Sequence, residues 1–372
     1  MRIQAAAVLL AGLNLAPGDG ARGRTPAAEA AIARPILPGS GRLSPGVATD
    51  SVNGVWSELP PPSGRALSAA IYDPVRDRML VVGGEDVLPL NDVWELSLSE
   101  HPRWNRVLTT GTPPPGRFGH SAIFDPVRDR VLIFGGTCGA LCRDFNDLWE
   151  LSLSGEPRWR EIVPLGTPPA ARGFHTAIYD PVRDRMIVFG GSEYSGPEDL
   201  WELSLSGVPT WTRLGALGAA PATRYGHTAV YDPVRDRMLV FGGYSSWPDP
   251  HHHNDVLELS LAGTPVWREL SPSGPLPTPR SQLAAIYDSG RDRVVIFGGY
   301  DGRRQLNDLW VLSLGTPLAW TRVHACGTLP SPRLGDVAIF DPWSSPGFVE
   351  GEHLRNHLTP GDGLSRLSAL DL

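Results

Sequence analysis

The sequence contains no lysine, so all 33 basic residues are arginine, and they are outnumbered by 40 acidic residues. The net charge of −7 offers no electrostatic footprint for nucleic acid. Three cysteines in 372 residues are too few for a disulfide scaffold. The apolar stretch near the N-terminus holds about 13 residues, too few to span a bilayer as a helix. These absences argue against nucleic-acid binding, a disulfide scaffold and a membrane span.

The missing lysine, together with abundant Ala, Gly and Pro, indicates GC-rich coding and predicts a GC-rich bacterial source. A single arginine is then weak evidence that a guanidinium group was selected. Cys138 and Cys142 lie four positions apart in one glycine-containing loop. A local disulfide and two unpaired thiols both fit this spacing. A metal site is less favoured, because no further Cys or His lies nearby.

The N-terminal segment divides into two parts. Residues 1–16 carry one Arg and then the apolar stretch, which suits the apolar region of a signal peptide, although no clean cleavage site follows. Residues 17–53 are rich in Ala, Pro, Gly and Arg without periodicity, which predicts a disordered linker. We therefore expect export to the periplasm or the cell exterior. A disordered leader on a cytoplasmic protein is the alternative.

Residues 54–372 are organised by one recurring unit. Its Gly-Gly pair returns at intervals of 52, 55, 52 and 56 residues, and the loop after the pair varies from 7 to 11 residues. Subtracting the loop leaves 45 residues every time. A constant frame with one variable loop is expected where packing fixes the frame and the loop lies at the surface. The second glycines of the pairs are Gly84, Gly136, Gly191, Gly243 and Gly299.

Each frame contains four short strand-like runs, and the turn after the first run has a physical cause. The turn reads Asp-Pro-Val-Arg-Asp-Arg in the first four units. Proline presets φ near −65° early in a turn, and Asp side chains bond to nearby backbone groups. Four short antiparallel strands at this period indicate a blade of a β-propeller.

The unit resembles the kelch repeat over about residues 54–342. An aromatic residue precedes strand two, Gly-Gly ends it, and a Trp follows after about ten residues, although Leu257 replaces the fourth Trp. The resemblance implies an all-β fold of antiparallel four-stranded blades. The aromatic residues are Tyr72, Phe124, Tyr179, Tyr231 and Tyr287, and the tryptophans are Trp94, Trp149, Trp201 and Trp310.

Six blades are expected, because both ends of the chain supply parts of a sixth. Residues 55–59 align with strand four, residues 337–342 align with strand one, and residues 347–351 fall in register with strand two. Residues 367–372 keep the rhythm of strand three. The N-terminal strand would then close the ring and remove open edges. Residues 343–366 lack the Arg-Asp-Arg and Gly-Gly signatures, so a damaged terminus stays open as an alternative.

One face of the ring is the expected binding face, because the connections between strands two and three, and between strand four and the next strand one, vary. An Arg precedes strand one in each of six units and could ring the mouth of the central channel, where guanidinium groups can grip a carboxylate or phosphate. The alternative is that each Arg pairs with an acidic residue of strand three. The six are Arg65, Arg117, Arg172, Arg224, Arg280 and Arg333.

Histidines occur in two settings. His120, His175 and His227 each stand three residues after one of these arginines, where we expect them to pack within strand one rather than bind a metal. The longest of the five variable loops contains Trp247, His251, His252 and His253. Trp247 lies off the repeat and could anchor a partner. The loop could also be inert, and adjacent histidines converge poorly on a metal ion.

No catalytic constellation emerges, and neither a cofactor nor a metal site is predicted. The copper site of galactose oxidase, which shares this fold, cannot be placed, because all three cysteines lie in loops without a supporting Tyr and His pattern. We expect a monomeric, non-catalytic module that binds a protein or peptide, with an acidic ligand as one option. The alternative is a secreted carbohydrate-binding or carbohydrate-active propeller with a site at the channel mouth.

Overall fold

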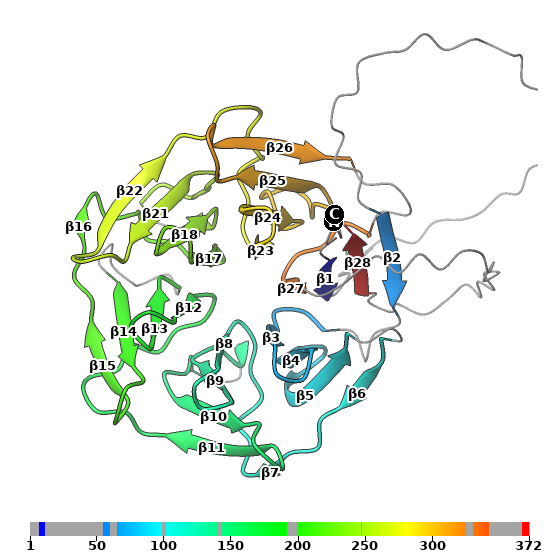
Figure 1. The fold of residues 1–372 in the computed structure, drawn as a ribbon, viewed down its shortest axis with the longest axis vertical. Helices are drawn as coiled ribbons and strands as arrows, with labels where there is room; N and C mark the ends of the chain where they lie inside the picture. The colour runs from blue at the N-terminus through cyan, green and yellow to red at the C-terminus, as the bar shows by residue number, and fades with distance from the viewer. Residues whose placement is uncertain are drawn as a thin grey trace, which may run out of the picture.

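The computed structural model is all-β, with no α-helix among the residues that it describes. Figure 1 views it down the central axis, with the sheets arranged around a channel. The described part of the chain has no helix long and apolar enough to cross a membrane. The described residues are 7–11, 55–59, 65–98, 102–139, 143–191, 199–246, 248–324, 330–341 and 367–371.

Five four-stranded antiparallel blades follow the repeat, each with its strands in sequence order from the channel outward. The first strands are β3 (Ala69–Asp73), β8 (Ser121–Asp125), β12 (Thr176–Asp180), β17 (Thr228–Asp232) and β23 (Ala284–Asp288). The second strands are β4 (Arg78–Glu85), β9 (Arg130–Phe134), β13 (Arg185–Phe189), β18 (Arg237–Phe241) and β24 (Arg293–Phe297). The third strands are β5 (Pro89–Ser97), β10 (Leu148–Ser152), β14 (Leu200–Ser204), β21 (Val256–Ser260) and β25 (Leu309–Ser313). The fourth strands are β6 (Trp104–Arg106), β11 (Arg158–Ile162), β15 (Thr210–Arg213), β22 (Val266–Leu270) and β26 (Ala319–Val323).

Four short strands supplement the blades. β7 (Thr110–Gly111) and β16 (Leu217–Gly218) add parallel to β11 and β22, at the outer edges of blades two and four. β19 (Tyr244–Ser245) and β20 (His251–His252) form a small hairpin inside the longest variable loop. The sheet edges in two blades are therefore covered by the connection from the preceding blade.

The core lies between neighbouring blades, because strand two is buried on both faces. Every residue of β9, β13, β18 and β24 is buried. The Phe that ends strand two packs against the Trp of strand four in the next blade, as in Phe241 and Trp320, whose ring centroids are 5.2 Å apart. The Trp of strand four is thus fixed by packing between blades, which explains its recurrence.

The predicted turns are present and also join the blades. In blade two, Asp125 Oδ1 accepts hydrogen bonds from the backbone amides of Val127 and Arg128. Asp129 has a φ of +48°, a left-handed conformation that Asp tolerates better than most residues. Arg128 then pairs with Asp184 of blade three. One sequence motif therefore sets both the local turn and a contact between blades.

The closing sheet is a composite of both chain ends. It has the order β2 (Val55–Leu59), β28 (Leu367–Asp371), β1 (Ala7–Ala11) and β27 (Val337–Asp341), and β27 lies between β23 and β3 around the channel. The structure thus shows five repeat blades rather than the six predicted, together with this sheet. Its second-strand place is filled by β1, whereas residues 347–351, which we predicted there, lie outside the described residues.

The position of β1 changes the interpretation of the N-terminal segment. The apolar residues that suit a signal peptide form a strand that pairs antiparallel with β27 on one side and with β28 on the other. The same apolar composition therefore serves a strand with a partner on each side, which a local pattern cannot distinguish from a signal peptide. The predicted linker, residues 17–53, lies outside the described residues.

Candidate binding face

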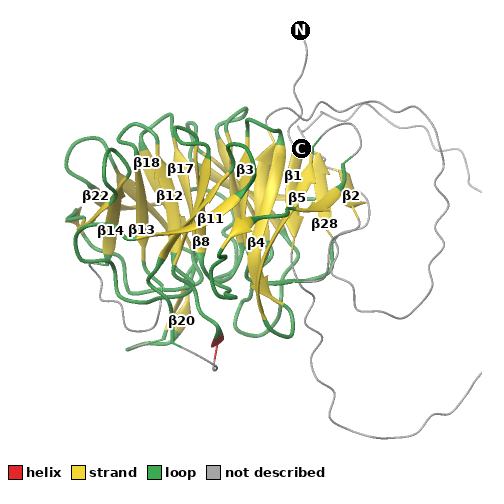
Figure 2. Cartoon of the chain, turned by 90° about the horizontal axis from the view of Figure 1, so that it is seen from below, coloured by secondary structure: helices red, strands yellow, loops and turns green. Residues whose placement is uncertain are grey.

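The connections divide between two faces of the ring, because the strands of each blade alternate in direction. We call one of them the loop face, and it consists of the described residues of two sets of connections. The connections between strands two and three are residues 86–88, 135–147, 190–199, 242–255 and 298–308. The connections from strand four to the next strand one are residues 107–120, 163–175, 214–227, 271–283 and 324–336. The opposite turn face holds the copied turns, such as residues 74–77 and 126–129. Figure 2 shows β20 of the loop face extending beyond the strands of the blades.

Exposed large apolar side chains are distributed differently on the two faces. The turn face carries five valines, four of them at the same position of the copied turn. The loop face carries seven at five positions of the unit, and the most exposed is Val87, at 90%. The seven are Val87, Leu88, Leu108, Val163, Leu165, Leu217 and Leu276. Because this apolar exposure is spread over more positions than on the turn face, the loop face is the better candidate for binding.

The repeated arginines are buried and paired. Arg117 is 1% exposed, and its Nη1 and Nη2 donate to the two carboxylate oxygens of Asp147 at 2.6 and 2.8 Å. Nη1 also donates to the Gly135 carbonyl oxygen, Nε donates to the Pro115 carbonyl oxygen, and the guanidinium lies 4.2 Å from the ring centre of Phe145. The donors of this guanidinium are therefore satisfied inside the blade.

The same arrangement recurs in the other repeat blades. Each Arg pairs with the Asp that opens strand three and with the carbonyl oxygen of the first glycine of the Gly-Gly pair. Burial would raise the pKa of Asp147, but the hydrogen bond and charge of Arg117 outweigh it and hold that pKa below its usual value. The pairs are Arg65–Asp92, Arg117–Asp147, Arg172–Asp199, Arg224–Asp255 and Arg280–Asp308.

These contacts correct the idea of an anion-binding arginine ring. The guanidinium groups are engaged in bidentate pairs, as the alternative interpretation expected, and an incoming carboxylate would have to displace an existing one. The sixth, Arg333, is also buried and donates to the Ser331 backbone and hydroxyl oxygens. The arginines therefore stabilise the blades from inside, and we do not propose them as ligand contacts.

His120, His175 and His227 are buried between blades. Each lies against the first glycine of the preceding blade's Gly-Gly pair, and a Cβ on Gly135 would stand 3.0 Å from His175 Cε1. His175 Nε2 lies 2.8 Å from the Ser121 hydroxyl, and burial together with the Arg117 charge lowers the pKa of His120 to about 3. Neutral, separately packed histidines fit a structural role, and they also explain why glycine is required opposite them.

The longest loop is ordered by its histidines. His253 Nε2 lies 2.7 Å from the Ser245 hydroxyl, and burial with the charge of Arg224 lowers the pKa of His253 to about 4. His252 stands between Tyr244 and Tyr300, whose ring centroids lie 4.8 and 5.7 Å from its own. His251 remains exposed, and Trp247 lies outside the described residues. Within the described part of the chain, no group of three or more His, Cys, Asp or Glu residues could hold a metal ion.

Cys138 is disulfide-bonded in the structure, whereas Cys142 lies outside the described residues. Cys138 is therefore not a free thiol, and its pairing with Cys142 in particular stays a prediction. The loop that carries it connects strands two and three of blade two, on the loop face.

A closed ring of backbone hydrogen bonds, which the sequence did not reveal, surrounds the channel mouth on the loop face. Six residues each donate an amide to the carbonyl of the preceding one, at 2.6 to 2.9 Å, and the last returns to the first. All six have a left-handed φ. In order they are Leu67, Gly119, Phe174, Gly226, Gln282 and Gly335. The signal was available at the second position after each repeated Arg, where glycine recurs in alternate units.

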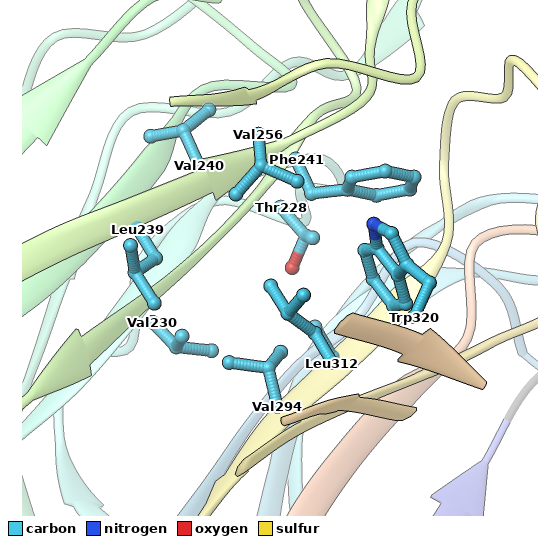
Figure 3. Close-up of a pocket in the computed structure, with 10 residues that line it drawn as sticks. Thr228, Val230, Leu239, Val240, Phe241, Val256, Val294, Leu312 and Trp320 are labelled. Carbon is cyan, nitrogen blue, oxygen red and sulfur yellow. The ribbon is translucent and has the colours of Figure 1, made fainter. Parts of the chain in front are cut away.

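The interior offers no room for a substrate between blades four and five. The cavity in Figure 3 measures about 10 Å³ and is lined by apolar side chains and Thr228, with Phe241 and Trp320 on one side. This volume barely admits one water molecule, and no titratable group lines it. The cavity therefore gives no support to a catalytic site.

Comparison with known proteins identifies the repeat. Residues 47–208 and 182–345 match the family model described as the KLHDC2/KLHL20/DRC7 Kelch-repeats domain. The chain is 34% identical over 204 residues to a leucine-zipper-like transcriptional regulator 1 homolog of Drosophila melanogaster, covering 52% of this chain and 19% of that protein. It is 33% identical over 241 residues to Adagio protein 3 of Arabidopsis thaliana, covering 60% and 37%. It is 31% identical over 253 residues to a host cell factor homolog of Caenorhabditis elegans, covering 62% and 31%.

These matches also correct the predicted location. The matched relatives are eukaryotic, and a transcriptional regulator and a host cell factor are intracellular proteins, so the prediction of an exported protein is wrong. The relatives give no support to a bacterial source. The alignments span 19% to 37% of the relatives' lengths, so the likeness covers only part of each relative.

Proposed function

The chain belongs to the kelch-repeat family, and from this premise we propose that it is a non-catalytic module that binds a protein partner through its loop face. The observation that carries the proposal is the contrast between the two faces. The turn face repeats one motif, whereas the loop face varies in loop length and exposes seven large apolar side chains at five positions of the unit, among them Val87 and Leu88 in a loop of variable length. A copied frame that holds dissimilar loops is the arrangement expected of a recognition surface.

The relatives support an interaction role. One is named a transcriptional regulator homolog and another a host cell factor homolog, and in each the matched repeats are a minor part of a longer chain. We infer that the repeats act here, too, as an attachment surface. The pairing of the arginines removes the argument for an acidic ligand. The carbohydrate alternative and the monomeric state remain predictions.

We also propose that the closing sheet serves as a sixth blade. The ring of six backbone hydrogen bonds supports this, because Gly335, which leads into β27, takes the same place in the ring as Gly119 and Gly226 in the repeat blades. A six-membered ring gives the loop face a continuous mouth, so a partner could contact several blades at once.

The test is affinity capture with matched variants of the two faces. Val87→Ser with Leu88→Ser alters the loop face, and Val75→Ser with Val127→Ser alters the turn face by the same chemistry at exposed positions. Cross-linked partners captured from the source cells should be lost with the loop-face pair and retained with the turn-face pair. The opposite result would transfer the binding role to the turn face, and equal capture by both variants would refute the proposal.

A further inference from the structure

Three bulky residues at the channel mouth hold a backbone conformation that favours glycine. The φ angles of Leu67, Phe174 and Gln282 are +56°, +58° and +53°. The other five non-glycine residues with positive φ in the described part of the chain are all Asp, a type that tolerates this region. Leu, Phe and Gln have no such tolerance, so these three positions are strained.

The ring that contains them does not need their side chains. The equivalent positions between them are Gly119, Gly226 and Gly335, which make the same amide-to-carbonyl bonds around the mouth. Glycine would therefore complete the ring at all six places without strain. The presence of a side chain at every second place calls for a reason outside the ring's own hydrogen bonding.

Each of the three side chains leans over the glycine before it. A Cβ on Gly335 would stand 2.7 Å from Leu67 Cδ2, and one on Gly119 would stand 3.2 Å from the ring of Phe174. A Cβ on Gly226 would stand 3.2 Å from Gln282 Cγ. The mouth therefore has room for three such side chains, and they occupy it from alternate blades.

Leu67, Phe174 and Gln282 form a surface that is apolar except for the side-chain amide of Gln282. All three are partly exposed, and Phe174 lies at 6.1 Å from Phe118 and 6.3 Å from Tyr225 between ring centroids. Within the described part of the chain, the Gln282 side chain makes no hydrogen bond. The cations nearest in sequence are Arg65, Arg172 and Arg280, and each is paired with an Asp of its own blade. The charge of the mouth thus favours an uncharged group.

Backbone strain in a folded protein is often kept where a side chain is needed for contact with a ligand. We propose that Leu67, Phe174 and Gln282, the mouth triad, form the floor of the partner site and receive an aliphatic or aromatic side chain of an extended peptide segment. Leu67 and Phe174 contact the apolar group, and the Gln282 amide bonds to a peptide group beside it. This inference rests on the proposed function, because it places the partner on the loop face.

The experiment uses variants in which a structural role and a binding role predict opposite results. Leu67→Gly, Phe174→Gly and Gln282→Gly each remove one side chain and relieve its strain. The full chain is immobilised and used to select from a displayed library of random twelve-residue peptides, and the most enriched peptide is then synthesised as the probe. Val127→Ser on the turn face is the matched control, because it also removes an exposed apolar group.

We expect the enriched peptides to share an aliphatic or aromatic residue. Phe174→Gly and Leu67→Gly should weaken binding of the probe at least tenfold and Gln282→Gly about threefold, with Val127→Ser unchanged. The melting temperatures of the glycine variants should equal or exceed that of the parent chain. A fall in melting temperature by several degrees would assign the triad to structure and overturn the proposal.

Two further outcomes separate this inference from the proposed function. A probe that the glycine variants bind as well as the parent, but that the Val87→Ser with Leu88→Ser variant does not bind, overturns the triad and leaves the loop face as the partner surface. A library that yields no enriched peptide, or only acidic ones, overturns the stated chemistry of the partner. Affinity capture on the two faces decides the proposed function independently.

Discussion

Arg128 of blade two places Nη2 2.7 Å from a carboxylate oxygen of Asp184 in blade three, while its Nη1 lies 3.1 Å from Asp125 in its own turn. The side chains of Arg128 and Asp184 are 30% and 25% exposed. The same link joins Arg76 to Asp129, Arg183 to Asp236 and Arg235 to Asp292. Adjacent repeat blades are therefore tied at the turn face by one copied ion pair.

Removing one of these ion pairs should lower the free energy of unfolding only slightly, because partly exposed ion pairs are screened by solvent. Arg128→Ala is expected to lower the free energy of unfolding by about 1 kcal/mol, and 1 M NaCl should shrink the difference. Urea unfolding at two salt concentrations measures it. A loss above about 3 kcal/mol, or one independent of salt, would contradict this estimate. Val127→Ser, which leaves the pair intact, is the control.

Low pH should weaken the same ion pairs over a defined pH range. The hydrogen bond from Arg128, opposed by partial burial, holds the pKa of Asp184 below its usual range. A carboxyl with a lowered folded pKa contributes stability that is fully present above its unfolded pKa and is lost as the pH falls through the folded value. The stability difference between the parent chain and Arg128→Ala should therefore be constant above about pH 5 and decrease below pH 4.

Removing a buried arginine should lower the free energy of unfolding more than removing a partly exposed one. Arg117→Ala leaves Asp147 without its bidentate partner, and we expect a loss of about 3–5 kcal/mol. Arg117→Met with Asp147→Asn, which removes both charges, should lose markedly less. Urea unfolding of the two variants compares them. Equal losses would mean that packing against Phe145, rather than the charge pair, determines the effect.

The frame of the blades was predictable because it is copied. Each tight turn follows from Pro and Asp chemistry, and the Gly-Gly pair is required by the neighbouring histidine ring, as Gly135 and His175 illustrate. The arginines were less decisive, because one residue pattern fitted both an anion-binding ring and internal pairing. The partner was the Asp of strand three, such as Asp147, which only the folded distances could establish.

Two features could not be read from local sequence. The left-handed conformation of Leu67 and Phe174 has no signal in their own residue types, and only alignment with Gly119, Gly226 and Gly335 in the other units indicates it. The strand Ala7–Ala11 pairs with residues more than 300 positions away, and a short apolar run carries no information about such a partner. Both are set by long-range contacts rather than by propensity.

A buried carboxyl makes the closing region sensitive to pH. Burial raises the pKa of Asp336 to about 7 against the opposing charge of Arg333, whose Nε lies 3.9 Å away. The folded chain then keeps a proton that the unfolded chain releases above about pH 4, so stability should fall as the pH rises from about 4 to about 7. Asp336→Asn should remove this dependence.

The expected gain for Asp336→Asn is about 1–3 kcal/mol at pH 8 and close to zero at pH 4, because the amide stays uncharged at both. Urea unfolding at the two pH values measures it. Asp249→Asn, at a side chain that is 90% exposed, is the control and should change neither value. A variant less stable than the parent at pH 8 would show that the Asp336 charge is needed by Arg333.

The composite closing sheet makes the start of the chain part of the fold. β1 pairs on both sides, with β27 and with β28, so its removal would expose the edges of both strands. Deleting residues 1–16 should therefore lower the melting temperature and increase self-association, measured by calorimetry and by sedimentation. A synthetic peptide of residues 5–13, added in trans, should restore part of the loss, and the same peptide with Leu9→Pro should not, because proline cannot join the interior of a sheet. An unchanged melting temperature after the deletion would mean that the sheet closes without β1.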